Sequence, residues 1–264
     1  MIEFDKYKVL TFDCYGTLID WESGVLAALR PVISSHSINL SKLKGSLEVA
    51  PATSLSKLND AQEAISGDLS DQQILELFAE FESDQQKGEY IKYREVLRRV
   101  VQKFGERLGF EPSPTEIDSL ANSLSNWQPF PDTVEALKNL KEKFKLAVIS
   151  NIDNDLFASS AKSLEVEFDW LITAEQAKTY KPSLHNFELA IQTIGIAHTA
   201  ILHVAQSLYH DIVPAKSLGI STVWVNRRGS KEGFGATPPA VAQPDLEVPD
   251  LKTLVSSSSS PKRE

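Results

Sequence analysis

Polar side chains follow three apolar runs of the sequence at the points where those runs end. Asp13, Tyr15 and Thr17 come directly after the run Val9–Phe12. The later members of the set are Ser150, Asn151, Lys181, Ser207 and Asp211. A carboxylate can act as a nucleophile, and hydroxyl, amide and ammonium groups can bind an anion. The set therefore suits hydrolysis through an ester on an aspartate.

Asp13 is the candidate nucleophile, and Lys181 is the candidate cation beside it. An adjacent ammonium lowers the pKa of a carboxylate, so we expect Asp13 to stay ionised. Gly16 lets the backbone approach a substrate closely, and the hydroxyls of Thr17 and Ser150 can bond an anionic oxygen. Taken singly, these residues also fit helix caps, turn residues or solvated side chains, so their combination carries the prediction.

Four short apolar runs have the continuous hydrophobic character of strands buried on both faces of a parallel sheet. They are Val9–Phe12, Leu146–Ile149, Ala200–Val204 and Thr222–Val225. Helical patterns follow at 131–144, 182–195 and 211–219. This alternation predicts an α/β fold, a doubly wound parallel sheet with a Rossmann-like core. Such sheets bind ligands at the carboxyl ends of their strands, where the polar set lies.

Residues 21–128 differ from the rest because their patterns are helical. The predicted helices are Gly24–Ile33, Asp71–Phe81, Tyr90–Leu108 and Pro114–Leu124, with a loop at 49–60. The sequence thus predicts an α/β core of residues 1–20 and 129–255 that is interrupted by a helical insert at 21–128. The polar, serine-rich residues 256–264 are predicted to form a disordered tail.

Composition restricts the partners and the location. The chain has 264 residues, 42% of them hydrophobic, and a formal net charge of −9. This charge argues against nucleic acid or an anionic membrane as a partner. The single cysteine, Cys14, excludes an internal disulfide, and strand alternation turns it away from Asp13 and into the core. Without a signal-peptide pattern or an apolar run of ~20 residues, we expect a soluble cytoplasmic protein.

Four ordered segments resemble the motifs of the haloacid dehalogenase-like hydrolase superfamily. They are FDCYGTL, ISN, YKPS and HVAQSLYHDIVPAKSLG, and the resemblance extends over about residues 8–228. It implies a hydrolase whose helical insert is a cap over the active site. The implied catalytic residues are Asp13 as nucleophile, Lys181, Ser150 and Asp211. The implied substrate-binding residues are Tyr15, Thr17, Asn151 and Ser207.

Two positions separate the branches of this superfamily. Its phosphatases usually carry an aspartate two residues after the nucleophile, where this chain has Tyr15. They also carry Gly-Asp, with the aspartate helping to hold Mg²⁺, where this chain has Ala205-Gln206. The form DCYGTL and the segment WVNRRG (224–229) instead resemble the 2-haloacid dehalogenase branch. In that branch the carboxylate displaces a leaving group from carbon, and no metal is required.

The chain also departs from the dehalogenase pattern. Dehalogenases carry a cap arginine for the halide, and the corresponding segment LELFAEFE (75–82) has Ala79 and Glu80 instead. The candidates to replace that arginine are Arg94, Arg98 and Arg99.

Four further side chains lie near the motifs or near the ends of the insert, and the sequence leaves their roles open. Phe187 stands where an aromatic hydroxyl is expected. The fourth motif is one residue longer than expected and contains His210, for which we favour a structural role over a general base. The tryptophans near the two ends of the insert, Trp21 and Trp127, can line the cavity or pack the hinge. The remaining histidines show no metal-ligand spacing, and they are His36, His185, His198 and His203.

The resemblance implies displacement of a leaving group from C2 of a small carboxylic acid, such as an L-2-haloacid, through an Asp13 ester and without a cofactor. One alternative keeps this mechanism but opens a strained cyclic imino acid such as azetidine-2-carboxylate. Another is an Mg²⁺-dependent small-molecule phosphatase, and a third is a binding protein without turnover. Relatives in the superfamily often form homodimers, so a homodimer is also open.

Overall fold

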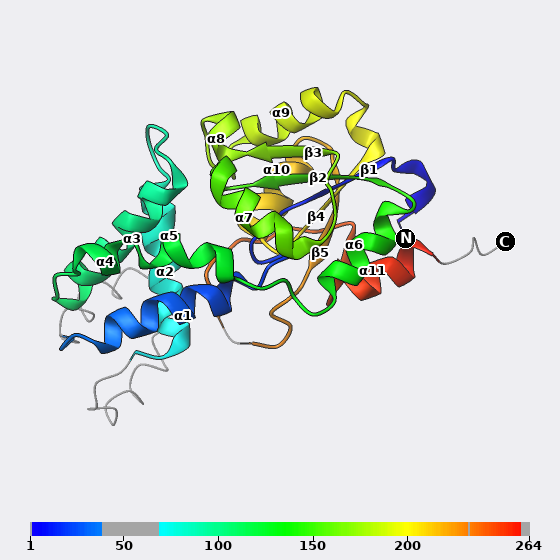
Figure 1. Cartoon of the computed structure of the whole chain (residues 1–264). Helices are drawn as coiled ribbons and strands as arrows, with labels where there is room; N and C mark the ends of the chain where they lie inside the picture. Colours follow the sequence, from blue (N-terminus) through cyan, green and yellow to red (C-terminus); the bar gives the residue numbers. More distant parts are fainter. Residues whose placement is uncertain (1, 39–68, 232, 260–264) are drawn as a thin grey trace.

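A computed structural model describes residues 2–38, 69–231 and 233–259 (Figure 1). Their centre is a six-stranded sheet with the order β3-β2-β1-β4-β5-β6, in which all neighbouring strands are parallel. The strands are β1 Val9–Phe12, β2 Lys145–Ser150, β3 Trp170–Thr173, β4 Ile201–Ala205, β5 Ser221–Val225 and β6 Leu246–Val248. Because the chain starts at the centre of the sheet and winds outward in both directions, the predicted doubly wound α/β fold is confirmed.

The four predicted strands correspond to β1, β2, β4 and β5, and no strand end differs from its prediction by more than one residue. The sequence patterns do not indicate β3 or β6, which are the two edge strands of the sheet. In β3 the first two residues are half-buried, and β6 has three residues with Glu247 exposed. Edge strands lack the continuous apolar character of central strands, so they give a weaker signal in the sequence.

Helices cover both faces of the sheet. They are α6 Thr133–Lys141, α7 Asn154–Leu164, α8 Ala174–Ala177, α9 Leu184–Ile194, α10 Val213–Ser217 and α11 Leu251–Ser258. Strand alternation places Leu10 and Phe12 in one apolar cluster, together with residues of α6, α7 and α11. Val9 points to the opposite face, where residues of α9 and α10 pack. The side chain of Asp13 has the same parity as Val9, so it belongs to the α9 and α10 side.

Several predicted helix ends differ from the structure. The helix predicted at 131–144 is shorter, because Phe144 already follows a turn that leads into β2. The helix predicted at 211–219 starts as a π-helical turn, Leu208–Ile212, and continues as α10. Residues 256–258 belong to α11 and are not part of a disordered tail. Their serine hydroxyls donate to backbone carbonyls of the same helix, and residues 260–264 lie outside the described part.

The insert forms a helical unit at one end of the sheet, as Figure 1 shows. Its helices are α1 Trp21–Ser34, α2 Asp71–Gln85, α3 Tyr93–Leu108, α4 Pro114–Ile117 and α5 Ser119–Ser123. The single helix predicted for Pro114–Leu124 is thus divided at Asp118, and the loop predicted at 49–60 lies outside the described residues. No helix within 2–38, 69–231 or 233–259 has the length and apolar character needed to cross a membrane.

The two connections between the insert and the core run side by side. Asp20 N donates to Gln128 O at 2.9 Å, and Phe130 N donates to Leu18 O at 3.0 Å. A second link comes from Asp153 of the core, whose carboxylate accepts from Tyr93 N at 2.9 Å and Arg94 N at 3.0 Å. Asp153 therefore satisfies free N–H groups at the start of α3 and fixes this helix against the core.

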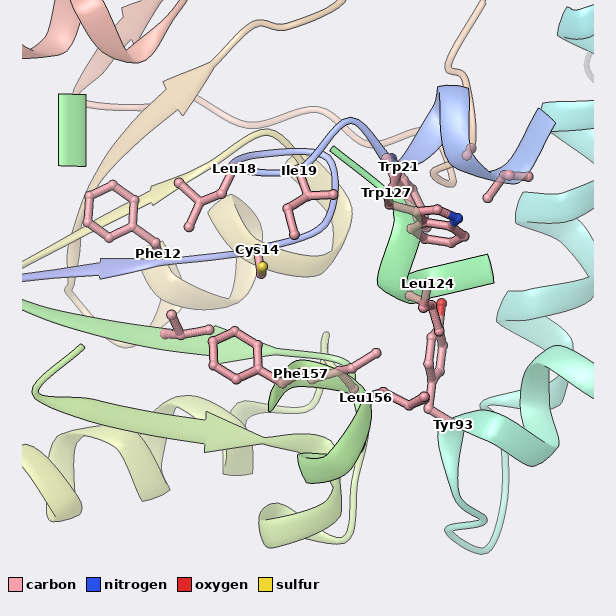
Figure 2. Packing of buried hydrophobic residues seen from close by; sticks show 14 of the residues in the cluster. Phe12, Cys14, Leu18, Ile19, Trp21, Tyr93, Leu124, Trp127, Leu156 and Phe157 are labelled. Atoms are coloured by element: carbon pink, nitrogen blue, oxygen red, sulfur yellow. The ribbon is translucent and has the colours of Figure 1, made fainter. Parts of the chain in front are cut away.

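Aromatic residues fill the junction between insert and core, and Figure 2 shows their packing. Trp127 packs edge-to-face on Tyr15 with ring centroids 6.0 Å apart, and its Nε1 donates to Ser123 Oγ at 3.0 Å. Trp21 packs edge-to-face on Phe78 at 5.6 Å. Cys14 is buried in the same cluster, which confirms its predicted core position, and burial raises the pKa of its thiol well above the ordinary value.

Gly24 of α1 leaves room for Trp127 at this junction. A Cβ atom at Gly24 would lie 2.5 Å from the indole ring, which is far closer than van der Waals contact. Glycine to alanine normally stabilises a helix by about 1 kcal/mol, but overpacking costs about 1–3 kcal/mol. We expect Gly24→Ala to lower the free energy of unfolding, measured by urea denaturation. In a Trp127→Leu background, the same substitution should cause a much smaller loss, because the ring that the new Cβ atom would contact is gone. A G24A protein as stable as the wild type would contradict the prediction.

Candidate active site

Asp13 lies at the carboxyl end of β1 with both carboxylate oxygens bonded. Its backbone N–H donates to Val204 O at 3.1 Å, which extends the β1–β4 pairing by one residue. Thr17 Oγ1 donates to Asp13 Oδ2 at 2.7 Å, and Lys181 Nζ donates to Asp13 Oδ1 at 2.9 Å. Gln206 N in turn donates to Thr17 Oγ1 at 2.9 Å. The carboxylate is thereby held in one orientation.

The turn after Asp13 requires glycine at position 16. Gly16 has φ +95°, in the left-handed region that favours glycine. A Cβ atom there would lie 2.8 Å from Trp21 Nε1. The close approach that the sequence suggests for a substrate is therefore made by the Trp21 indole in this structure.

Lys181 is buried, and its ammonium is fully bonded. Nζ donates to Asp13 Oδ1 at 2.9 Å, to Asp211 Oδ1 at 2.6 Å and to Ile149 O at 2.9 Å. An ammonium has three protons, so none remains for a further partner. Asn151 holds the backbone of the same residue, because its Oδ1 accepts from Lys181 N at 2.7 Å and its Nδ2 donates to Lys181 O at 3.1 Å. The Asn151 amide thus positions Lys181, a task that differs from the substrate binding implied for it.

His203 of β4 is also part of the hydrogen-bond network around Lys181 and Asp211. Its Nε2 lies 3.0 Å from Asp211 Oδ1, and its Nδ1 lies 2.9 Å from Thr11 Oγ1. Phe187, which stands where a hydroxyl was expected, packs edge-to-face on the His203 ring at 5.2 Å. No sequence motif indicates a role for His203. Its signal is a histidine in the middle of an otherwise apolar strand, which must find polar partners when buried.

Burial and charge act against each other in this network. Burial raises the pKa of Asp13 above its ordinary value; Lys181 opposes this effect and Asp211 adds to it. The expected lowering of the Asp13 pKa is therefore wrong, because desolvation exceeds the attraction of one lysine. Burial also acts on Asp211, but Lys181 and His203 hold its pKa below the ordinary value. For Lys181, burial is outweighed by Asp13 and Asp211, which raise its pKa.

A cavity of about 40 Å³ opens beside this network, between the core and the insert. All predicted site residues except Thr17 line it. The additional lining residues are Trp21, Glu82, Tyr93, His210 and Thr237. Trp21 thus lines the cavity while Trp127 packs the hinge. This space is small, since sites for drug-sized ligands are commonly about ten times larger.

Ser150, Tyr15 and Ser207 differ in how free their hydroxyl groups are. In the described part of the chain, no group bonds the Ser150 hydroxyl, which leaves it available to a ligand in the cavity. The Tyr15 hydroxyl lies 2.7 Å from Ser160 Oγ of α7, and burial raises its pKa well above the ordinary value. Ser207 Oγ accepts from His210 N at 2.9 Å and so caps the π-helical turn.

The family follows from a family model and from similar sequences. Residues 7–219 match the model of the haloacid dehalogenase-like hydrolases. The chain belongs to this family. It is 29% identical over 171 residues to (S)-2-haloacid dehalogenase of Pseudomonas sp. (strain YL), covering 63% of this chain and 70% of that protein. It is 27% identical over 172 residues to haloacetate dehalogenase H-2 of Moraxella sp. (strain B), covering 64% and 74%.

The fold of this hydrolase also resembles that of a solved dehalogenase. The L-2-haloacid dehalogenase from Xanthobacter autotrophicus, with chloropropionic acid covalently bound, superposes with a TM-score of 0.67 at 19% identity. The match covers 95% of this chain and 97% of that one. The predicted family, enzyme class and fold are therefore confirmed.

The cap arginines do not reach the cavity of this hydrolase. Arg94 pairs with Asp155 at 3.1 Å, Arg98 with Asp118 at 3.1 Å, and Arg99 with Glu95 at 3.0 Å. All three side chains are more than 40% exposed, and none of them lines the cavity. None of the three candidates is therefore positioned at the cavity to replace the halide-binding arginine in this structure.

His210 lines the cavity as a neutral imidazole. Burial lowers its pKa to about 4, the nearby Lys181 charge acts in the same direction, and Asp211 opposes both. Its Nδ1 lies 3.2 Å from Ser207 Oγ, on the turn that carries Asp211. These contacts fit the structural role that the sequence favours.

Glu82 and Tyr93 also line the cavity, although no sequence motif indicates either of them. Glu82 Oε1 accepts from the Tyr93 hydroxyl at 2.6 Å, and both residues are buried. The sequence feature that indicates Glu82 is helical spacing, because Ile74, Phe78 and Glu82 follow one another at intervals of four on the buried face of α2. An acid on an apolar helical face either has a partner or has a function.

The donor set does not fit the Mg²⁺ that the phosphatase alternative requires. Lys181 Nζ lies between Asp13 and Asp211 and bonds Oδ1 of each, while Thr17 takes the other Asp13 oxygen. Gln206 stands where the phosphatase pattern has an aspartate. Among the described residues, no three His, Cys, Asp or Glu side chains group as metal ligands. Hard cations prefer several free carboxylate oxygens, which this donor set does not supply.

Proposed function

We propose that this hydrolase displaces a leaving group from C2 of a small carboxylic acid through an ester on Asp13. The observation that carries the proposal is the Asp13 carboxylate, which Thr17 and Lys181 orient at the edge of a small cavity. Burial raises the pKa of Asp13, so its ionised form is more basic than an exposed aspartate. A basic, oriented and poorly solvated carboxylate is suited to attack at carbon.

The reaction has two steps. A carboxylate oxygen of Asp13 bonds to C2 as the bond from C2 to the leaving group breaks. Water then attacks Cγ of Asp13, and the 2-hydroxy acid departs. Lys181 and the unbonded hydroxyl of Ser150 are placed to bind the substrate carboxylate or the oxyanion of the second step. Lys181 acts through charge here, because its three protons are engaged.

The names of similar proteins support the substrate class. The two relatives described above act on an (S)-2-haloacid and on haloacetate. In the dehalogenase from Xanthobacter autotrophicus, chloropropionic acid is covalently bound. Small 2-halocarboxylic acids are therefore the first substrates to test, and no metal is required by the proposed chemistry.

One turnover in H₂¹⁸O tests this proposal. The enzyme is mixed in excess with a panel of 2-substituted acids, and the Asp13 peptide is analysed by mass spectrometry. We expect ¹⁸O in the Asp13 carboxylate, because water attacks Cγ and leaves its oxygen on the protein. We also expect equal turnover with and without EDTA. Label found only in the product would overturn the ester mechanism, and loss of activity in EDTA with phosphate release from an aryl phosphate would favour the phosphatase.

A further inference from the structure

Glu82 of the cap is a buried carboxyl group without a cation. Glu82 is 4% exposed, and none of the ion pairs in the described part of the chain includes it. Tyr93 bonds Oε1 at 2.6 Å, whereas Oε2 has no hydrogen-bond partner among the described residues. The side chain lines the same cavity as Asp13. A buried carboxyl without a cation favours its neutral form, which can donate a proton.

Among the titratable groups that line the cavity, Glu82 is the one suited to donate and accept a proton near neutral pH. Those that face the cavity with it are Asp13, Tyr15, Tyr93, Lys181, His210 and Asp211. Burial raises the pKa of Glu82 to about 7; the Tyr93 hydrogen bond opposes this effect, and the charge of Asp13 adds to it. The pKa of His210 is lowered to about 4, and those of both tyrosines are raised by burial. Lys181 and Asp211 bond each other, and Asp13 is the nucleophile.

We propose that Glu82 gives a proton to the leaving atom on C2 and then takes one from water, so that the preferred substrates carry nitrogen or oxygen at C2. This inference rests on the function proposed above and specifies the class of leaving group that the enzyme displaces. It differs from halide displacement, because a halide departs without a proton, whereas an amine or an alkoxide is a poor leaving group until it is protonated.

The proton and electron balance closes over the two steps. In the first step, an Asp13 oxygen bonds to C2, the C2–N or C2–O bond breaks with its electron pair on the leaving atom, and Glu82 protonates that atom. In the second step, water adds to Cγ of Asp13 and gives one proton to the Glu82 carboxylate. The ester C–O bond then breaks, and the other water proton goes to the oxygen of the 2-hydroxy acid. Asp13 and protonated Glu82 are thereby restored.

The cavity lining also favours a leaving group that needs a proton over a halide. Among the described residues that line it there is no arginine, and the Lys181 protons are already used. A departing halide would therefore lack a cationic donor. A departing amine or alcohol would instead meet the neutral carboxyl of Glu82.

The test compares Glu82→Gln with the matched control Glu80→Gln. Glutamine keeps an acceptor for Tyr93 but cannot donate an acidic proton, and Glu80 lies on the same helix paired with Arg107. The substrates are azetidine-2-carboxylate, 2-methoxypropionate and 2-chloropropionate. With the nitrogen and oxygen substrates, we expect E82Q to slow ester formation about 10²- to 10⁴-fold. With 2-chloropropionate, whose leaving group takes no proton from Glu82, the Asp13 ester should form in E82Q at about the wild-type rate. E80Q should match the wild type throughout.

A second readout uses the Tyr93→Phe variant. Loss of the Tyr93 hydrogen bond removes an interaction that lowers the Glu82 pKa, so this pKa should rise. The alkaline limb of the rate profile, where the general acid is deprotonated, should therefore move to higher pH. A merely structural Glu82 would leave the position of this limb unchanged.

Two outcomes would overturn the inference, and both differ from failure of the ester mechanism. One is E82Q turnover of the nitrogen or oxygen substrates at the wild-type rate. The other is a wild-type enzyme that accepts only the halide. If wild-type Asp13 forms no ester with any acid, the proposed function fails, and pH-difference infrared spectra of wild type and E82Q still decide the proton claim. Absence of a carboxyl band that titrates near pH 7 and disappears in E82Q would refute it.

Discussion

Asp13→Asn should form no ester and should lose at least about 10³-fold in turnover. An amide is a far weaker nucleophile than a carboxylate, and the other two carboxyl groups that line the cavity, Glu82 and Asp211, are not oriented by the Thr17 hydroxyl at the end of β1. Asp211 has one oxygen bonded to both Lys181 and His203, and its side chain is 1% exposed. The measurement is steady-state turnover together with the mass of the peptide that contains residue 13.

Thermal unfolding of the Asp13→Asn variant separates lost chemistry from lost structure. Burial raises the folded-state pKa of Asp13 above its unfolded value, so ionised Asp13 lowers stability at neutral pH. The sign follows from linkage, since stability tied to a raised carboxyl pKa is present at low pH and is lost as pH rises through the folded pKa. D13N should therefore unfold at a temperature equal to or above that of the wild type at pH 8. The exposed control Asp155→Asn should retain wild-type turnover.

The sequence predicts the central part of the sheet and the residues at its edge because both follow from local patterns. Continuous apolar runs locate β1, β2, β4 and β5, and parallel strands bring their carboxyl ends together. Asp13, Ser150 and Asp211 are therefore expected near one another from the sequence alone. The same patterns do not predict the edge strands β3 and β6, because each is partly exposed and has a short apolar run.

Other features depend on depth and on contacts between distant segments, which spacing alone does not give. A lysine beside Asp13 predicts a lower carboxyl pKa, but the extent of burial reverses the sign. Helical spacing shows that Glu82 faces inward, but only the docking of α2 on the core shows that it shares a cavity with Asp13. His203 is similar, because its partners Thr11 and Asp211 come from different segments of the chain.

Asn151 and Tyr15 show that even a recognised motif does not reveal contacts with distant segments of the chain. The motif places both residues beside the nucleophile, where either can contact a substrate. In the structure, the Asn151 amide bonds the backbone of Lys181 and the Tyr15 hydroxyl bonds Ser160 of α7. A motif thus specifies where side chains lie along the chain, whereas long-range partners decide which of them remain free for a ligand.

Lys181→Met should be the most destabilising single change in the site. Lys181 is 1% exposed and bonds the carboxylates of both Asp13 and Asp211. Removal of one partner of a buried ion pair costs about 3–5 kcal/mol, because the remaining charge is neither solvated nor compensated. Here two carboxylates would remain, so we expect a loss at the upper end of this range at neutral pH, together with loss of turnover.

The pH dependence of this loss distinguishes charge from packing. In the wild type, Lys181 helps to hold the Asp211 pKa below its ordinary value, so this contribution to stability is present above the unfolded pKa and is lost as pH falls. In K181M, the folded-state pKa of both carboxyls should lie above the unfolded value, and stability should fall as pH rises. The difference between the two proteins should therefore increase from acid to neutral pH in urea unfolding experiments.

Two variants control this experiment. The double variant Lys181→Met with Asp211→Asn leaves one carboxylate in place of two, and it should recover part of the lost stability at neutral pH. Lys87→Met removes an ammonium from an exposed pair with Asp84, where water replaces the lost partner, and it should unfold as the wild type does. A K181M protein whose deficit is the same at all pH values would show that the methylene chain of Lys181, and not its charge, stabilises the site.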